Sequence, residues 1–321
     1  MITLHCGLHK TGSSSIQVAL RSVRIRKGNV HLPVSGMDQS EDAWRYRLAN
    51  LGDNDVLSNE NLLGSPFDGY GTAERRAALL KDSLSGRGFQ LIWYIRPQLS
   101  WLQSVYLQGV QQGSSETAEG FLSRCLMSPS LNWSHLWDVL ESTGAQAVVP
   151  RAYVPSRNVV SDFLNLCGHG VPTTKQAELR VNTSISPAQA VIMRELNAQS
   201  DSAKNEMLRA AFQQGSRRSS VKRQSVFSES RQVEVLQAYA GDWEAVTSRV
   251  RVTDALESQQ FEQVGARWWD QKAEYVGTSL VAPEVQAEIM DVLTNVIGGS
   301  GRTSRPRYRR VASELWRKVI R

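Results

Sequence analysis

Hydrophobic residues in the first half of the chain gather in four short runs that helical patterns separate. The four runs, each suited to a buried strand, are 1–6, 55–60, 89–96 and 145–153. Apolar residues recur at helical spacing over 13–22, 72–86, 98–112 and 131–142. Strands that alternate with helices predict an α/β fold with a parallel sheet covered by helices on both faces. In such a sheet, ligands bind beyond the carboxyl ends of the strands.

Strand patterns stop at about residue 175, and helical patterns continue. Ser186 and Pro187 stand where a helix cap and a first helical residue are expected, and 231–250 repeats apolar residues at helical spacing. We therefore expect an α/β core over 1–175 and a mainly helical part over 176–321. We found no internal repeat.

One segment between these helices has a different composition. Residues 213–230, QQGSRRSSVKRQSVFSES, are polar, basic and rich in serine. Such a composition predicts a loop that becomes ordered around a ligand, if at all.

Composition places the 321-residue chain among ordinary soluble globular proteins, with 41% hydrophobic and 21% charged residues. It has no stretch of the ~18 apolar residues that cross a bilayer, and its start lacks the pattern of a secretory signal. Its three cysteines, Cys6, Cys125 and Cys167, are too widely spaced for a disulfide framework or a metal site. These features predict a reduced, cytoplasmic protein.

The formal net charge of +6 is concentrated at the C-terminus. Residues 302–321 hold eight Arg or Lys against one acid, Glu314. This excess is larger than that of the whole chain, so the other 301 residues carry no net positive charge. The basic composition therefore predicts no nucleic-acid surface on the main body.

A glycine-rich turn joins the first expected strand to the first expected helix. Residues 6–17 read CGLHKTGSSSIQ, with Lys10 and three serines close to two glycines. A strand, a glycine-rich loop and a helix N-terminus form an anion site, because backbone N–H groups and the helix dipole converge there.

The turn departs from the nucleotide-binding motif G-x-x-x-x-G-K-[ST]. Gly7 and Gly12 have the spacing of its glycines, but Ser13 follows the second glycine and the lysine comes earlier, at Lys10. A kinase would also need an acid at the end of a neighbouring strand to hold magnesium, and the run 55–60 ends in Glu60 rather than an aspartate.

KTGSSS, with its displaced lysine, resembles the 5′-phosphosulfate loop of sulfotransferases that use 3′-phosphoadenosine 5′-phosphosulfate (PAPS). RPQLSWLQSVYLQ resembles the family's 3′-phosphate motif, with Arg96 at a strand end and Ser104 eight residues later. The two motifs occur in the family's order, each at a strand-to-helix junction. The more common KTGTT is KTGSS here, which keeps both hydroxyls.

Further similarity extends over roughly residues 1–200. LSNENL, LNWSHLWDVLESTG, SDFLNLCG and NTSISPAQA resemble bacterial members that sulfate carbohydrates or glycolipids. The resemblance implies a P-loop-like fold, PAPS as donor, adenosine 3′,5′-bisphosphate as product, and no metal.

The resemblance also implies roles for individual residues. Lys10 would stabilise the departing phosphate, and Arg96 with Ser104 would bind the 3′-phosphate. The residues that would surround the 5′-phosphosulfate are Thr11, Gly12, Ser13, Ser14 and Ser15. The structural alternatives are a solvated lysine, helix-capping serines and a surface arginine before Pro97.

The acceptor must lose a proton, so the reaction needs a general base. Glu60 is the first candidate, because carbohydrate-acting members of the family that the chain resembles use a glutamate as the base. His9 is the second candidate. Glu60 could instead be an acid in the first turn of a helix that Ser58 caps.

Other side chains suit structural roles. The remaining histidines, His5, His31, His135 and His169, form no metal pattern. The aromatic residues expected in the core or the pocket wall are Trp93, Tyr94, Trp101 and Tyr106.

The sequence thus predicts a PAPS-dependent sulfotransferase that acts on a hydroxyl of a carbohydrate or glycolipid. The alternatives are a nucleotide-dependent kinase and a non-catalytic nucleotide-binding module. The tail 302–321 could form a short amphipathic helix that binds an anionic membrane surface, pack on the core, or supply an arginine to the donor. The first alternative would place the protein at the inner face of the membrane.

Overall fold

The structure is a computed structural model, and it describes residues 1–22, 28–33, 40–154, 157–168, 185–198 and 224–276. The basic tail 302–321, with its three alternative roles, lies outside these residues. The chain forms two compact units, and each is assembled from three separate segments of the sequence. The first unit comprises Met1–Trp101, Cys125–Asn182 and Leu236–Asp270, and the second comprises Leu102–Arg124, Thr183–Val235 and Gln271–Arg321.

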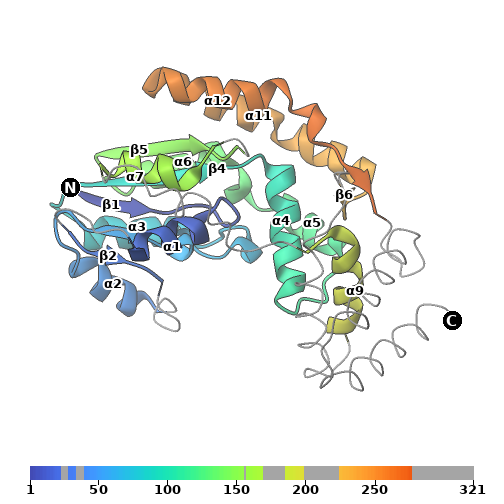
Figure 1. Ribbon diagram of the computed structural model, residues 1–321, viewed down its shortest axis with the longest axis horizontal. Coiled ribbons are helices and arrows are strands. Elements are labelled where there is room, and N and C mark those ends of the chain that lie inside the picture. The colour runs from blue at the N-terminus through green and yellow to red at the C-terminus, as the bar shows by residue number, and fades with distance from the viewer. Residues whose placement is uncertain (23–27, 34–39, 155–156, 169–184, 199–223, 277–321) are drawn as a thin grey trace. The chain divides into compact units, whose positions relative to one another are not determined.

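The first unit is built on a five-stranded parallel sheet (Figure 1). Its strands are β1 (Ile2–His5), β2 (Val30–His31), β3 (Val56–Ser58), β4 (Phe89–Ile95) and β5 (Ala147–Ala152). The strand order is β2-β3-β1-β4-β5. The α/β class and the parallel sheet expected from the sequence are therefore confirmed. The two-residue edge strand β2 was missed because it is too short to form a hydrophobic run.

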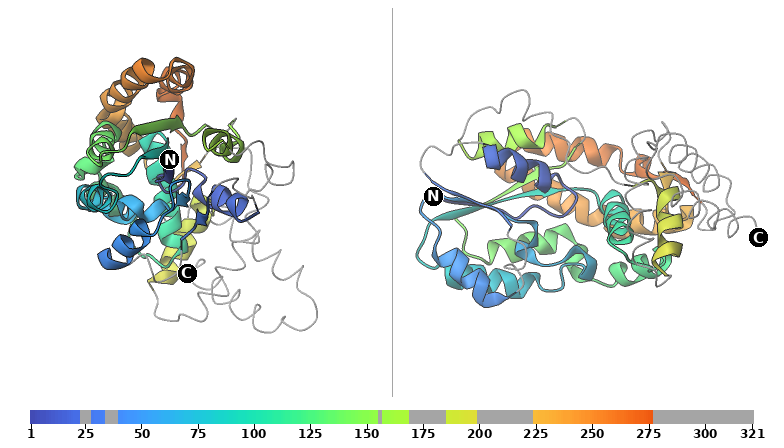
Figure 2. Two further views of the ribbon diagram at one scale, coloured as in Figure 1. Left: turned by 90° about the vertical axis from the view of Figure 1, so that its left-hand side faces the viewer. Right: turned by 60° about the horizontal axis from the view of Figure 1, so that its bottom comes forward.

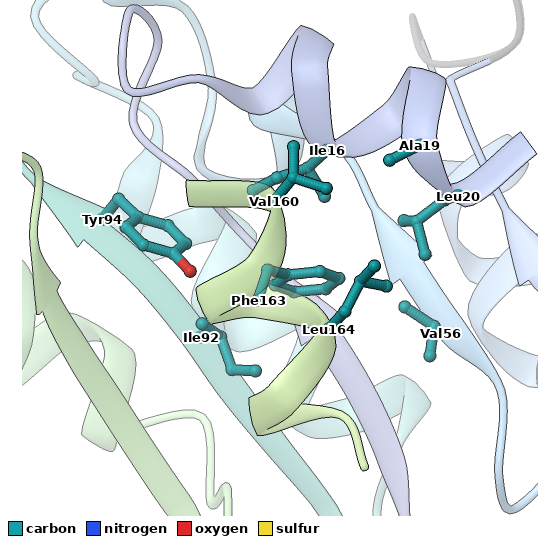
Figure 3. Close-up of a cluster of buried hydrophobic side chains, with 9 residues drawn as sticks. All are labelled: Ile16, Ala19, Leu20, Val56, Ile92, Tyr94, Val160, Phe163 and Leu164. Carbon is teal, nitrogen blue, oxygen red and sulfur yellow. The ribbon is translucent and has the colours of Figure 1, made fainter. Parts of the chain in front are cut away.

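Helices cover both faces of this sheet. The helices that flank it include α1 (Ser13–Ser22), α2 (Glu41–Ala49), α3 (Ala73–Ser83), α6 (Trp133–Glu141) and α7 (Val159–Leu166). The right-hand view of Figure 2 shows α1 and α7 on one side of the sheet and α2 and α3 on the other. Successive β4 side chains point to opposite faces. Tyr94 packs beneath α1 and α7 (Figure 3), whereas Trp93 contacts Trp137 of α6 with ring centroids 6.1 Å apart.

This arrangement creates a topological switch point at the carboxyl ends of β1 and β4. The chain leaves β1 directly into α1, on the first face. It leaves β4 through α4 (Gln98–Gln111) and reaches α6, on the second face, before it returns to β5. In open parallel sheets, ligands bind where neighbouring strands send the chain to opposite faces. The expected anion loop and Arg96 both lie at this point.

Two later helices complete the first unit. The long helix α11 (Glu229–Thr253) begins in the second unit and continues in the first, which also holds α12 (Ala255–Ala266). Asp242 of α11 accepts hydrogen bonds from the N–H groups of Trp133 and Ser134, at 2.7 and 2.9 Å, and so caps α6. Trp243 of α11 packs against Phe261 of α12 with ring centroids 5.3 Å apart.

The second unit is helical with one small sheet. Its elements include the later part of α4, most of α5 (Ala118–Leu126), α9 (Pro187–Asn197), β6 (Gln224–Ser225) and β7 (Glu274–Tyr275). Ser186 caps α9 and Pro187 begins it, as the sequence predicted, and Gln189 completes a capping box that was not predicted. The parallel pair β6–β7 was not expected, because each strand has only two residues.

Short 3₁₀ helices connect several elements. They are η2 (Glu60–Leu63), η3 (Pro66–Asp68), η4 (Pro129–Leu131) and η6 (Trp269–Gln271). The expected loop 213–230 lies partly outside the described residues, and its described end contains β6 and the start of α11 rather than loop alone. Within the described part of the chain, no helix is long and apolar enough to cross a membrane.

The cluster in Figure 3 yields a prediction about what supports the anion loop. Phe163 of α7 is fully buried against α1 and the sheet. Phe163→Ala should lower the free energy of unfolding by about 3–5 kcal/mol, because the lost contacts leave a cavity. Urea denaturation followed by circular dichroism measures this. Tyr46→Ala, at a 71% exposed position on α2, is the control and should change stability by less than ~0.5 kcal/mol. Similar losses for both variants would contradict the assigned role.

Candidate functional site

The loop between β1 and α1 uses a backbone conformation that L-residues rarely adopt. Lys10 has φ +66° and Gly12 has φ +88°, both in the left-handed region. The N–H groups of Ser15 and Ile16 donate to the carbonyl of Gly12, at 3.0 and 3.1 Å, so the first turn of α1 starts there. The first N–H groups of a helix have no intrahelical acceptor. This end of α1 can therefore bind an anion through its backbone.

Close packing requires glycine at position 12. A Cβ atom on Gly12 would lie 2.8 Å from Cγ1 of Val159 and 3.5 Å from the ring of Tyr153. The Thr11 hydroxyl donates to the carbonyl of Leu8 at 2.5 Å, which closes the turn from within. The segment after β5 thus forms one wall of the loop.

Two buried polar atoms lie beneath the loop without a hydrogen-bond partner among the described residues: Ser13 Oγ and His5 Nε2. A Cβ atom on Gly7 would lie 2.8 Å from the first and 2.5 Å from the second. His5 Nδ1 is 2.8 Å from Ser58 Oγ, and burial lowers the pKa of His5 to about 3. A buried hydroxyl with no partner at a helix N-terminus fits a ligand with acceptor oxygens, such as a phosphate or sulfate group.

Arg96 reaches this loop from the end of β4. Its Nη1 donates to the carbonyl of Lys10 at 3.3 Å, and its Nε donates to Ser100 Oγ at 2.9 Å. The guanidinium also lies over the ring of Tyr153, 5.7 Å from the centroid, and Trp133 Nε1 donates to the Arg96 carbonyl at 2.9 Å. Arg96 is therefore held beside the loop from several sides, not placed as a free surface side chain.

The two cations affect each other. Burial lowers the pKa of Lys10 below its ordinary value, and the nearby charge of Arg96 lowers it further. Both causes disfavour the ammonium form. A bound anion would favour that form again, so the arrangement is suited to a ligand with more than one negative charge.

Glu60 begins η2 directly after β3, next to β1 in the sheet. Gln17 of α1 donates from Nε2 to Glu60 Oε2. The neighbouring Asn59 donates its N–H to the carbonyl of His5 at 3.0 Å. The carboxylate is thus fixed close to the helix that starts in the anion loop. It can act as a hydrogen-bond acceptor or as a base there.

His9 is buried, and both of its ring nitrogens have partners. Nδ1 lies 3.1 Å from Tyr70 Oη, and Nε2 lies 3.1 Å from Asn61 Oδ1. Burial lowers its pKa to about 4; the charge of Lys10 adds to this effect, and the hydrogen bond to Asn61 opposes it. The described structure therefore presents His9 as a neutral, fully bonded group. Its role as a base stays an untested alternative.

Ser104 lies on the part of α4 that belongs to the second unit, and its pairing with Arg96 stays a prediction. Ser100, one helical turn before Ser104, accepts a hydrogen bond from Arg96, and the sequence analysis did not consider it. It also missed Gln17, but a signal for this residue exists. Gln17 stands four residues after Ser13, so it shares the helix face that the loop begins.

The aromatic residues expected in the core are buried: Trp93, Tyr94, Trp101 and Tyr106. No group of three or more His, Cys, Asp or Glu side chains that could hold a metal ion occurs in the described part of the chain. Outside the site, His31 pairs with Asp55 at 2.6 Å and His135 with Glu74 at 3.6 Å. His169 lies outside the described residues.

Comparisons with known proteins add one partial similarity. The chain is 28% identical over 116 residues to an uncharacterized protein of Archaeoglobus fulgidus; these residues are 36% of this chain and 32% of that protein. The match thus spans about a third of the length of that relative. No protein-family model matches the chain, and no solved structure matches it. The comparisons therefore bring no function to the site.

The packing around Gly12 gives a prediction with a matched control. Gly86 also has a left-handed φ, +76°, but a Cβ atom there would meet nothing within 4 Å. Gly86→Ala should cost about 1–2 kcal/mol of stability for the backbone conformation alone. Gly12→Ala should cost about 1–3 kcal/mol more, because the methyl group must displace Val159. Urea denaturation of both variants measures the difference. Equal losses would show that the wall formed by Val159 does not constrain the loop.

Proposed function

We propose that the protein is a PAPS-dependent sulfotransferase with a P-loop-like core, and that it transfers a sulfuryl group to a hydroxyl of a carbohydrate or glycolipid. The observation that carries the proposal is the hydrogen bond from Arg96 to the carbonyl of Lys10. Two motifs that resemble the donor-binding motifs of this family, 86 residues apart in sequence, meet in one place at the switch point of the sheet.

The distribution of positive charge supports a donor with two separate anionic groups. The loop and the N-terminus of α1 suit one group, and the planar guanidinium of Arg96 suits a second. PAPS carries a phosphosulfate on the 5′ side of its ribose and a phosphate on the 3′ side. Tyr153, beside both Arg96 and Gly12, would line the space between them.

Each residue would have one task in the transfer. The donor supplies an activated sulfuryl group, whose sulfur forms a bond with the acceptor oxygen as its bond to the bridging phosphate oxygen breaks. Lys10 would neutralise the negative charge that develops on that bridging oxygen. The N–H groups at the start of α1 and the Ser13 hydroxyl would hold the phosphosulfate oxygens.

Glu60 is the base that we favour. It would accept the proton of the acceptor hydroxyl, and Gln17 would keep its carboxylate oriented. The choice of a carbohydrate or glycolipid acceptor is based on the sequence resemblance alone. Cys6, Cys125 and Cys167 are free thiols, which agrees with the cytoplasmic location that we propose.

Ligand-dependent thermal stability tests the donor. Adenosine 3′,5′-bisphosphate at 100 times its Kd should stabilise the protein by about 2.7 kcal/mol, whereas ATP with magnesium should not. Arg96→Ala should weaken adenosine 3′,5′-bisphosphate far more than adenosine 5′-phosphate, which lacks the second phosphate. Arg251→Ala, at an exposed position on α11, is the control for the loss of one cation. It should leave the affinity for both ligands unchanged.

Each alternative makes a different prediction in this experiment. Stabilisation by ATP with magnesium, without stabilisation by adenosine 3′,5′-bisphosphate, would favour the kinase. Donor binding without turnover of labelled PAPS by the wild type, even by hydrolysis, would favour the non-catalytic module. Equal weakening of both adenosine ligands by Arg96→Ala would show that Arg96 supports the loop without reading the 3′-phosphate.

Transfer assays with labelled PAPS test the chemical roles. Lys10→Ala should lower kcat by about 10²- to 10³-fold, because it removes a donor aimed at developing charge. Glu60→Gln should also lower kcat strongly but keep affinity for adenosine 3′,5′-bisphosphate. Lys81→Ala, in the last turn of α3, is the control and should behave as the wild type. Near-normal turnover by Lys10→Ala would refute the assignment of the loop.

A further inference from the structure

Lys10 and Tyr70 share an unusual property. Among the described residues, they are the two non-glycine residues with φ in the left-handed region, at +66° and +59°. Such a conformation costs on the order of 1–3 kcal/mol and persists only where surrounding contacts hold it. The two residues are 60 positions apart in sequence, yet one histidine joins them. Tyr70 Oη contacts His9, the residue directly before Lys10.

His9 is held by four hydrogen bonds to three other residues. Tyr70 Oη accepts the His9 main-chain N–H at 3.0 Å and lies 3.1 Å from Nδ1. Asn61 Oδ1 lies 3.1 Å from Nε2. Trp101 Nε1 donates to the His9 carbonyl at 2.9 Å. Both main-chain polar groups and both ring nitrogens of His9 are therefore used.

The donor and acceptor roles follow from these contacts. Since Tyr70 Oη accepts the main-chain N–H, its own proton is free to be donated to His9 Nδ1. Nδ1 is then the acceptor nitrogen of a neutral imidazole, and Nε2 carries the proton, which it donates to Asn61 Oδ1. Burial and the charge of Lys10, which together lower the pKa of His9 to about 4, keep the ring neutral at neutral pH, and the hydrogen bonds to Tyr70 and Asn61 select this tautomer.

We infer that His9 is a positioning residue that holds Lys10 in its left-handed conformation and fixes it relative to Glu60. A peptide bond joins His9 to Lys10, and its hydrogen-bond partner Asn61 directly follows Glu60. The inference rests on the proposed function for the roles of Lys10 and Glu60. Tyr70, whose backbone is also in the left-handed region, places its hydroxyl against His9.

Loss of the Tyr70 hydroxyl should release the loop. The side chain of Lys10 lies beside Arg96 in a partly buried place, and both conditions lower its pKa. A loop free to leave the left-handed conformation would expose the ammonium group to water. The pKa of Lys10 would then rise toward the ordinary lysine value of about 10.4.

The first experiment compares Tyr70→Phe with Tyr106→Phe. Tyr106 is buried like Tyr70, and its hydroxyl donates to the carbonyl of Glu116. Its variant therefore controls for the loss of one buried, hydrogen-bonded hydroxyl. NMR of lysine-labelled protein without donor gives the pKa of Lys10, which should rise in Tyr70→Phe and stay unchanged in Tyr106→Phe. In transfer assays, kcat of Tyr70→Phe should fall by about 10- to 100-fold, because a small displacement of a catalytic group has a large effect. An unchanged pKa of Lys10 in folded Tyr70→Phe would overturn the inference.

The second experiment tests His9 itself and does not need Tyr70→Phe to fold. In His9→Asn, the amide oxygen can replace Nδ1 as the acceptor for Tyr70, whereas His9→Ala loses both ring contacts. His9→Asn should therefore keep a higher kcat than His9→Ala, and both should keep the pH profile of the wild type. Equal inactivity of the two variants, with loss of the acidic limb of the profile, would make His9 the base and overturn the inference.

NMR also separates this inference from the proposed function. The ¹⁵N shifts of the His9 ring in the wild-type protein should show a neutral ring protonated at Nε2 from pH 5 to pH 8, since its pKa is about 4. A ring that titrates near the ordinary pKa of ~6.5, or that is protonated at Nδ1, would overturn the positioning role. This result and the pKa of Lys10 hold whether or not the protein turns over PAPS, so absence of sulfotransfer would refute the proposed function alone.

Discussion

The contact between Arg96 and the carbonyl of Lys10 depends on how far two neighbouring parallel strands extend. β1 ends at His5, opposite Ile92, whereas β4 continues to Ile95. The longer strand therefore carries Arg96 past the point where the chain leaves the sheet for the anion loop. Because the loop turns through the left-handed residue Lys10 before α1 begins, its carbonyl remains within reach of the guanidinium. A site with cations on both sides follows from the sheet register and one strained turn.

Local sequence patterns predicted the elements in which burial is strongly periodic. The helix over 13–22 has the predicted bounds, and the four longest strands lie within the predicted runs. Elements with a weak signal were missed. Helix α2 buries only Trp44 and Leu48 of its nine residues, and β2 is half-buried and has two residues. Their place in the fold depends on contacts with neighbouring elements, which no short window of sequence contains.

The same distinction applies to the candidate site. The residues of the loop could be chosen from one segment, because a strand, two glycines and a helix start define an anion site locally. The residues that orient this loop could not be identified in the same way, because they lie in other segments of the sequence. Tyr70, Asn61 and Trp101 contact His9 from three other segments. None of these contacts can be read from the sequence, where a histidine next to the proposed catalytic lysine looks like a base. The hydrogen bonds of His9 in the structure are the basis for the positioning role that we infer instead.

The later part of the chain also contributes to the framework of the candidate site. Glu257 of α12 has a side chain that is 1% exposed, and it accepts hydrogen bonds from the N–H group of Ala152 and from Arg157. A buried carboxylate is unfavourable unless it is paired and hydrogen-bonded, and here both conditions are met at the carboxyl end of β5. Arg157 stands two residues before Val159, which packs against Gly12. The ion pair therefore anchors the wall of the anion loop, and residues far beyond the α/β pattern of the first half are part of the site's framework.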